Sequence, residues 1–140
     1  MANETMTTFL EHVRVTTHHR EEIIDITNSI EDVVSRSGIT KGSCTVQSVH
    51  TTCGLTINEN ADTDVKADIL EQLASLIPQD GHFKHTEGNS DAHVKTSLVG
   101  VSHVVGIEVG RLSLGTWQGI MLCEFDGPRS REVIVVVQGE

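Results

Sequence analysis

Three of the eight histidines occupy positions where an imidazole could do chemistry. His50 ends a predicted strand, His85 lies in a long polar loop, and His93 lies in the first turn of a predicted helix. The positive end of the helix dipole keeps the His93 ring neutral and able to bind a metal, and the free N–H groups there could receive a phosphate. Neither an HExxH motif nor paired Cys and His spacing is present, so ordinary surface or hydrogen-bonding roles stay open. The other histidines are expected to be solvated or structural: His12, His18, His19, His82 and His103.

A cluster of acidic and amide side chains lies between a predicted strand and the helix that follows it. It comprises Asn58, Glu59, Asp62 and Asp64. Carboxylates suit both a hard cation such as Mg²⁺ and proton transfer, so Glu59 could serve as a general base. In the structural alternative, Asp62 caps the helix and Glu59 is a solvated turn residue. The residues alone favour neither interpretation.

The segment 110–118 combines turn glycines with side chains that suit ligand binding. Arg111 could clamp a phosphate through two hydrogen bonds and Trp117 could stack on a ring, whereas the glycines also fit a simple hairpin. Lys95 follows His93 by two residues on one predicted helix. Residues at this spacing point to different faces, so their cooperation is not assured.

The three cysteines, Cys44, Cys53 and Cys123, are an odd number without CxxC spacing. We expect them to be reduced and to act as small buried hydrophobic residues in a cytoplasmic protein. Cys53 follows His50 by three residues, but its neighbours are apolar, which argues against a nucleophilic thiol. The sequence also lacks a GxSxG motif for serine chemistry.

The formal net charge is -10, from 10 Lys and Arg against 20 Asp and Glu, which argues against nucleic-acid binding. The longest apolar run, Val133 to Val137, is far shorter than the ~20 residues of a membrane-spanning helix. The first residues are polar and acidic, unlike a signal peptide. We therefore expect one cytoplasmic domain over residues 1–140 that binds neither nucleic acid nor membrane.

Apolar periodicity predicts strands and helices that interleave without a regular βαβ order. The run Val133 to Val137 is apolar at every position, which predicts a central strand or a subunit interface. Asn28 and Glu31 have capping-box spacing at the start of the first predicted helix. The expected fold is α+β, one compact domain with a mostly antiparallel or mixed β-sheet, two main helices and one short helix. Strands are predicted at 5–17, 24–26, 43–58 (two, broken near Gly54), 104–109, 117–125 and 132–138, and helices at 28–38, 62–78 and 90–98.

Several blocks of the chain resemble the YjbQ family, small proteins also described as secondary thiamine-phosphate synthases. The likeness covers nearly the whole chain in the same order. The blocks are His50-Thr51-Thr52, Leu55-Thr56-Ile57-Asn58-Glu59, His85 through Glu87-Gly88, Asp91-Ala92-His93-Val94-Lys95, Gly110-Arg111, Leu114-Gly115-Thr116-Trp117-Gln118 and Glu124-Phe125-Asp126-Gly127-Pro128-Arg129.

The resemblance implies a compact homotrimeric α+β protein that joins a hydroxymethylpyrimidine diphosphate to a thiazole phosphate and releases pyrophosphate. It implies a divalent metal ion, for which three imidazoles favour zinc or another transition ion while Mg²⁺ stays possible. The chain departs from the family at Cys53, where a small residue such as alanine is usual. The resemblance implies His50, His85 and His93 as metal ligands, with Glu59, Asp91 and Arg111 beside them. We expect the catalytic residues to be Glu59, Asp91, Lys95 and Arg111, and the substrate-binding residues to be Thr51, Asn58, Trp117 and Gln118.

Two other functions remain open at this stage. One is a metal-dependent hydrolase of a small phosphorylated metabolite, with Glu59 as general base. The other is a non-enzymatic module that binds a metal ion or a metabolite.

Overall fold

The secondary structure consists of eight strands and three helices, and a computed structural model describes residues 5–140. The elements in chain order are β1 (Thr7–Thr16), β2 (Glu22–Asp25), α1 (Thr27–Ser37), β3 (Lys41–Ser48), β4 (Cys53–Glu59), α2 (Thr63–Leu76), α3 (Ser90–Val99), β5 (Ser102–Glu108), β6 (Arg111–Leu112), β7 (Gln118–Glu124) and β8 (Ser130–Gly139).

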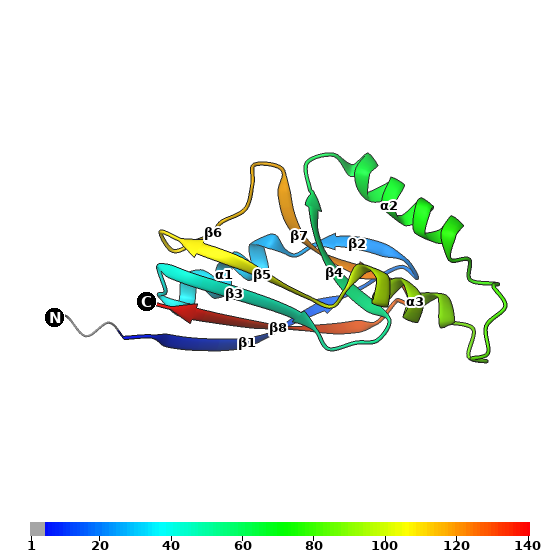
Figure 1. The fold of residues 1–140 in the computed structure, drawn as a ribbon, viewed down its shortest axis with the longest axis horizontal. Helices are drawn as coiled ribbons and strands as arrows, with labels where there is room; N and C mark the ends of the chain where they lie inside the picture. Colours follow the sequence, from blue (N-terminus) through cyan, green and yellow to red (C-terminus); the bar gives the residue numbers. More distant parts are fainter. Residues whose placement is uncertain (1–4) are drawn as a thin grey trace.

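The strands form two antiparallel sheets (Figure 1). The larger has the order β1-β8-β3-β5-β6 and the smaller has the order β2-β7-β4. β8 lies between β1 and β3, so the prediction that Val133 to Val137 form a central strand is confirmed. The α+β class is likewise confirmed, and every strand pair is antiparallel.

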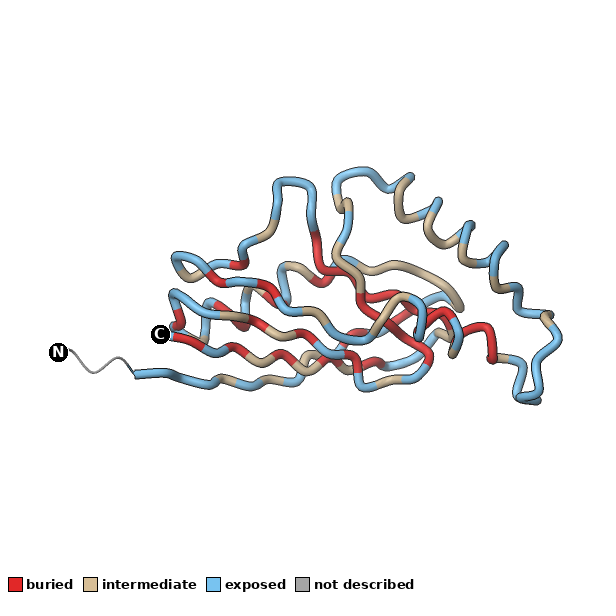
Figure 2. Tube along the Cα trace, in the orientation of Figure 1, coloured by how far each residue is buried: buried red, intermediate tan, exposed pale blue. Residues whose placement is uncertain are grey.

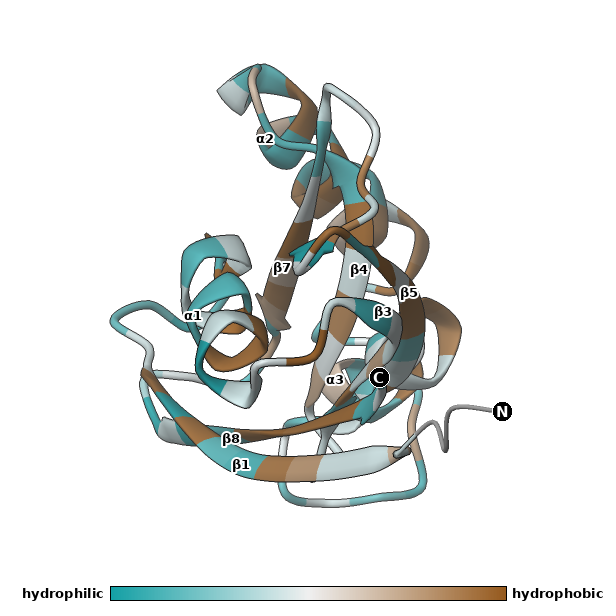
Figure 3. Cartoon of the chain, turned by 90° about the vertical axis from the view of Figure 1, so that its left-hand side faces the viewer, coloured by the Kyte–Doolittle hydropathy of each residue, from teal (hydrophilic) through white to brown (hydrophobic). Residues whose placement is uncertain are grey.

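The core lies between the two sheets and α1. On β8, Val133, Val135 and Val137 are fully buried, because alternate side chains of a strand point to the same face. Ile30 and Val34 of α1 are also fully buried and contribute to the same cluster. Figure 3 shows α1 packed inside the curve of the larger sheet. The core is almost entirely aliphatic, as the scarcity of aromatic residues requires.

The two other helices differ in how they pack. Within the described part of the chain, none of the 14 residues of α2 is buried (Figure 2). α3 packs against β4 and buries Ala92, Lys95 and Thr96. Among residues 5–140 we find no helix with the length and apolarity needed to cross a bilayer.

Two local expectations were wrong. The break between β3 and β4 falls at residues 49–52, and Gly54 lies inside β4. Glycine is needed at that position because a Cβ would stand 2.7 Å from the carbonyl oxygen of Gly100. α1 begins at Thr27 rather than at a cap on Asn28. The Asp25 carboxylate accepts hydrogen bonds from both the backbone N–H and the hydroxyl of Thr27, which fixes the earlier start.

Candidate functional site

An open polar cavity of about 370 Å³ lies where the turn after β3, the start of α3 and the loop between β7 and β8 come together. These three segments are far apart in the sequence but meet at one end of the sheets, the end that carries α3 in Figure 1. The cavity is lined by Val49, His50, Thr51, Thr52, Glu87, Asn89, His93, Asp126, Arg129 and Arg131.

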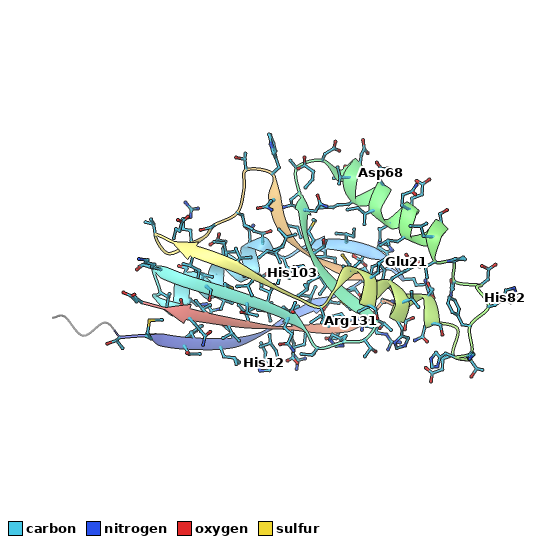
Figure 4. All side chains as sticks on the ribbon, viewed as in Figure 1. His12, Glu21, Asp68, His82, His103 and Arg131 are labelled. Carbon is cyan, nitrogen blue, oxygen red and sulfur yellow. The ribbon has the colours of Figure 1, made fainter. Side chains whose placement is uncertain are left out.

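Arg131, on β8, lines this cavity. The residue is labelled among the side chains in Figure 4. The residue is only 3% exposed, and three sets of contacts fix its position. Nε donates to Oε1 of Glu124 at 2.8 Å, and Nη2 donates to Oε2 of Glu124 and to the hydroxyl of Thr52 at 2.9 Å. Within residues 5–140, Nη1 makes no hydrogen bond, so its two N–H groups remain free to bind a ligand.

Glu124 is the fully buried counter-charge that holds Arg131. Its carboxylate also accepts hydrogen bonds from the Thr17 hydroxyl at 2.7 Å and from the Asp126 backbone N–H at 3.1 Å. Burial alone would raise the pKa of Glu124, but the hydrogen bonds from Arg131 and Thr17 outweigh it and lower the pKa. The carboxylate is therefore ionised, and the guanidinium stays charged beneath the cavity.

His50 presents a neutral imidazole to the same cavity. Nε2 of the ring accepts a 2.8 Å hydrogen bond from the backbone N–H of Glu132. Burial, together with the charge of Arg131, lowers the pKa of His50. In the neutral ring the proton must then be on Nδ1, which makes Nδ1 the hydrogen-bond donor.

His93 and His85 are neighbours, with ring centres 5.5 Å apart at 83°. Two imidazoles bonded to one tetrahedral zinc ion at ~2.1 Å would have ring centres about 5 Å apart, close to this distance. Here the rings meet edge to face, and Nε2 of His85 lies 3.6 Å from Oε2 of Glu87. His50 does not complete the trio in this arrangement, since its Nε2 lone pair is occupied by the Glu132 N–H. Over residues 5–140, no group of three or more His, Cys, Asp and Glu side chains forms a metal-ligand cluster.

Other polar groups complete the cavity wall. Arg129 donates to the Asp126 carboxylate at 3.1 Å and to its carbonyl oxygen at 2.8 Å. Asn89, at the start of α3, donates its amide N–H to the same carboxylate at 2.9 Å. The carboxylates of Glu87 and Asp126 are the ligand type that Mg²⁺ prefers. The cavity therefore combines hydrogen-bond donors that could bind an anion with carboxylate oxygens that could bind a cation.

Asp91 and Lys95 contact each other, but neither residue lines the cavity. Lys95 Nζ lies 2.8 Å from Oδ2 of Asp91 and 3.3 Å from Oε1 of Glu21, and Arg20 Nη2 donates to Oδ1 of Asp91 at 3.0 Å. Burial would raise the pKa of Asp91, but the bonds from Arg20 and Lys95 lower it instead. These two predicted catalytic residues form a buried ionic network that anchors α3 to the segment before β2.

The remaining predicted residues lie at distant places within the chain. Glu59 pairs with Gln118 at the far end of β4, roughly 20 Å along the strand from Cys53 and from the turn that carries His50. Arg111 pairs with Glu108, next to the start of β3, while His50 follows the end of β3. Within one chain, Glu59 and Arg111 are therefore distant from the histidines. Asn58 and Trp117 lie beside Glu59, at the same distant end of β4.

Cys53 is not available as a nucleophile. It is fully buried, and burial raises the pKa of its thiol to about 12, so the thiolate is absent at neutral pH. Cys44 and Cys123 are also free and buried among the described residues, as expected. Of the remaining histidines, His103 has a structural role, since Nε2 lies 2.7 Å from the Leu55 carbonyl oxygen.

Sequence reasoning overlooked Arg131 and the significance of Glu124. A signal was present, because Arg131 occupies the same alternate positions as the core residues Val133, Val135 and Val137. A charged residue in register with a buried face requires a buried partner. Nothing in the local sequence identified that partner, which lies on β7.

Comparison with known proteins gives consistent matches over almost the whole chain. Residues 11–140 match the family model described as UPF0047 protein YjbQ-like. A UPF0047 protein of Methanocaldococcus jannaschii is 50% identical over 91% of this chain and 92% of its own length. The UPF0047 protein YugU of Bacillus subtilis is 47% identical over 93% of this chain and 99% of its own length.

Solved structures show the same fold. A YbjQ-like protein of unknown function from Sulfolobus solfataricus superposes with a TM-score of 0.93 at 32% identity, covering 97% of this chain and 100% of that one. An uncharacterized protein of the yjbq/upf0047 family from Clostridium acetobutylicum has a TM-score of 0.89 at 50% identity, covering 91% and 98%. The arrangement of strands and helices described above is therefore common to these proteins.

Proposed function

The chain belongs to the YjbQ-like family of UPF0047 proteins, and we propose that it is a small enzyme of the secondary thiamine-phosphate synthase type. In this reaction the bond between the pyrimidine methylene carbon and the diphosphate oxygen breaks, and pyrophosphate leaves with the electron pair. The thiazole nitrogen then forms a bond to the same carbon. The main catalytic requirement is to stabilise the negative charge that develops on the departing diphosphate.

Arg131 is the observation that supports this proposal most directly. Its charge is fixed by Glu124, its side chain lines the cavity, and within residues 5–140 its Nη1 makes no hydrogen bond. A guanidinium that is held rigidly binds phosphate oxygens strongly, because little order must be created on binding. Ordinary surface arginines lack this restraint.

The other cavity residues contribute donors for the same anion. The hydroxyl of Thr51 and the backbone N–H groups at the start of α3 can bind phosphate oxygens. The neutral His50 ring has its proton on Nδ1 and can donate it as a hydrogen bond to the leaving oxygen. Arg129, paired with Asp126, adds a second guanidinium at the rim.

A divalent metal ion on His50, His85 and His93 belongs to the same proposal. His85 and His93 are close enough to share an ion, whereas His50 would first have to release the Glu132 N–H. Bound there, the ion would neutralise charge on the leaving pyrophosphate. Zinc or another transition ion suits imidazole, while Glu87 and Asp126 keep Mg²⁺ possible.

A cytoplasmic homotrimer is also proposed. The exposed apolar side chains support association, since Leu76 on α2 is 71% exposed and Trp117 is 65% exposed. Arg111 and Glu59 lie too far from His50 to act in one chain, so any role for them at this cavity requires a neighbouring subunit. Free buried cysteines fit a reducing compartment.

The test is to incubate the purified protein with the hydroxymethylpyrimidine diphosphate and the thiazole phosphate and follow both by phosphorus NMR. We expect thiamine phosphate and pyrophosphate from the wild type, and at least about tenfold less from Arg131→Lys, which keeps the charge beside Glu124 but loses Nη1. His93→Ala should also be impaired, while Arg36→Lys on the distant surface of α1 should match the wild type.

Three results would contradict the proposal in different ways. Equal turnover in the wild type, Arg131→Lys and His93→Ala would discard the site. Release of phosphate without coupling to the thiazole would favour the hydrolase. Tight binding of the diphosphate without any product would favour a binding module.

A further inference from the structure

Thr17 is the first residue after β1, and it supports the polar cavity without lining it. Its backbone N–H donates to the carbonyl oxygen of Arg129 at 2.9 Å, which extends the pairing of β1 and β8 by one residue beyond Thr16 and Ser130. Alternate residues of an extended strand point to the same face. Arg129 therefore shares a face with Arg131, and both residues line the cavity.

The hydroxyl of Thr17 connects the supports of these two arginines. The residue is 2% exposed, and its Oγ1 donates to Oε1 of Glu124 at 2.7 Å. The same Oγ1 accepts a 2.8 Å hydrogen bond from the backbone N–H of Arg129. The hydroxyl has one proton, and the other possible acceptor, the Arg129 carbonyl oxygen, is farther away at 3.1 Å. One buried hydroxyl therefore bonds both to the counter-charge of Arg131 and to the backbone that carries Arg129.

The loop between β7 and β8 packs closely against the segment that follows β1. The backbone N–H of Gly127 donates to the carbonyl oxygen of Arg20 at 2.9 Å. A Cβ at Gly127 would stand 2.3 Å from the carbonyl oxygen of His19 and 2.8 Å from Oγ1 of Thr17, so only glycine fits there. The loop is therefore fixed against this segment on the side that carries the Thr17 hydroxyl.

Arg129 and Arg131 each keep one guanidinium nitrogen for a ligand. Arg129 bonds to Asp126 through Nε and Nη2, and Arg131 bonds through the same two nitrogens to Glu124 and Thr52. In the part of the chain that the structure describes, Nη1 of either residue makes no hydrogen bond. Their Cα atoms are roughly 7 Å apart for two residues of extended chain. Two guanidiniums on one face at this spacing suit an anion with two adjacent phosphoryl groups.

We propose that Thr17 is a positioning residue, which holds Arg129 relative to Arg131 so that both guanidiniums bind one diphosphate. This inference rests on the proposed function, because the diphosphate is the part of the substrate that the cavity binds. It adds that the preference for a diphosphate over a single phosphate depends on a hydroxyl that does not touch the ligand. Without this hydroxyl, Arg131 is still held by Glu124 and Thr52, whereas the backbone N–H of Arg129 loses its acceptor.

The test measures the affinities of pyrophosphate and inorganic phosphate by calorimetry for the wild type, Thr17→Val and Thr17→Ser. We expect the wild type to bind pyrophosphate more tightly than inorganic phosphate. Thr17→Val keeps the shape of the side chain but loses its hydrogen bonds. It should weaken pyrophosphate binding by about threefold to tenfold and inorganic phosphate binding by less than about twofold. Thr17→Ser keeps the hydroxyl and should restore the affinity for pyrophosphate.

Two further variants separate positioning from a general loss of stability. Val33→Ala removes a buried side chain of α1 and lowers the melting temperature, but it should bind both anions as the wild type does. Arg129→Lys keeps the charge but loses the Nη1 donors, so it should also weaken pyrophosphate binding. If Thr17 acts through Arg129, adding Thr17→Val to Arg129→Lys should cause no further loss.

The results distinguish this inference from the proposed function. Pyrophosphate binding that Arg131→Lys weakens but Thr17→Val leaves unchanged would overturn the inference alone. A loss in Thr17→Val that Thr17→Ser shares, that is equally large for inorganic phosphate, or that adds to the loss in Arg129→Lys would also overturn it alone. Failure of the wild type to bind pyrophosphate would overturn both.

Discussion

Replacing Glu124 by glutamine tests how the cavity is built, because the carboxylate is fully buried and holds the charge of Arg131. The amide keeps the shape of the side chain but loses its charge. In the native protein, Arg131, Thr17 and Asp126 donate hydrogen bonds to the carboxylate oxygens. The new amide N–H group would face at least one of these donors, and two donors cannot bond to each other. Arg131 would be left buried without a counter-charge.

The expected loss is large for one substitution. Breaking a buried ion pair from one side typically costs about 3–5 kcal/mol, against a total stability of roughly 5–15 kcal/mol for a domain. For a chain of this size, such a loss lowers the melting temperature by roughly 10–15 °C. The free energy of unfolding is measured by urea titration of Glu124→Gln and of the control Glu71→Gln, which alters an exposed residue of α2.

A double variant removes the remaining ambiguity. Glu124→Leu combined with Arg131→Met deletes both charges, and it should be more stable than Glu124→Gln because no unpaired charge stays buried. A loss below about 1 kcal/mol in Glu124→Gln would refute the reasoning, since it would mean that Arg131 is solvated rather than held by this carboxylate.

Further predictions concern pH, the ionic network behind α3 and metal binding. The pKa of Glu124 is lower in the folded protein than its ordinary value near 4.5. The stabilisation of the fold by this carboxylate is therefore complete above that ordinary value and is lost as the pH falls through the folded pKa, and urea titrations at successive pH values measure the loss. Asp91→Asn leaves Lys95 buried with a weakened partner and should destabilise the fold by about 3 kcal/mol, measured by thermal unfolding. Zinc affinity measured by competition with a chelator should fall at least about tenfold in both His85→Ala and His93→Ala, and an unchanged affinity would exclude their pairing at a metal.

The sequence was most informative about local elements. The apolar run Val133 to Val137 predicted a central strand, and the spacing of Asn28 and Glu31 predicted a helix in the region of α1, because both signals come from residues close in the chain. The break between β3 and β4 was misplaced at Gly54. That glycine serves a close approach to the backbone of Gly100, which is a contact across the fold and leaves no local trace.

The candidate site was predictable only in part for the same reason. His50 and His93 were identified and do share a cavity. Asp91 and Lys95 were predicted to be catalytic. Their partners Arg20 and Glu21 are some seventy positions away, so a buried network could not be told from a catalytic pair. Only the packing of α3 against β4 decides which face of the helix meets the cavity.

The central claim is that Arg131 binds the phosphate of the substrate. A crystal structure of the protein with pyrophosphate tests this most directly. We predict a phosphate oxygen within about 3 Å of Nη1 of Arg131, with Glu124 still bonded to Nε and Nη2. Pyrophosphate bound elsewhere, or in the cavity without contact to Nη1, would contradict the account.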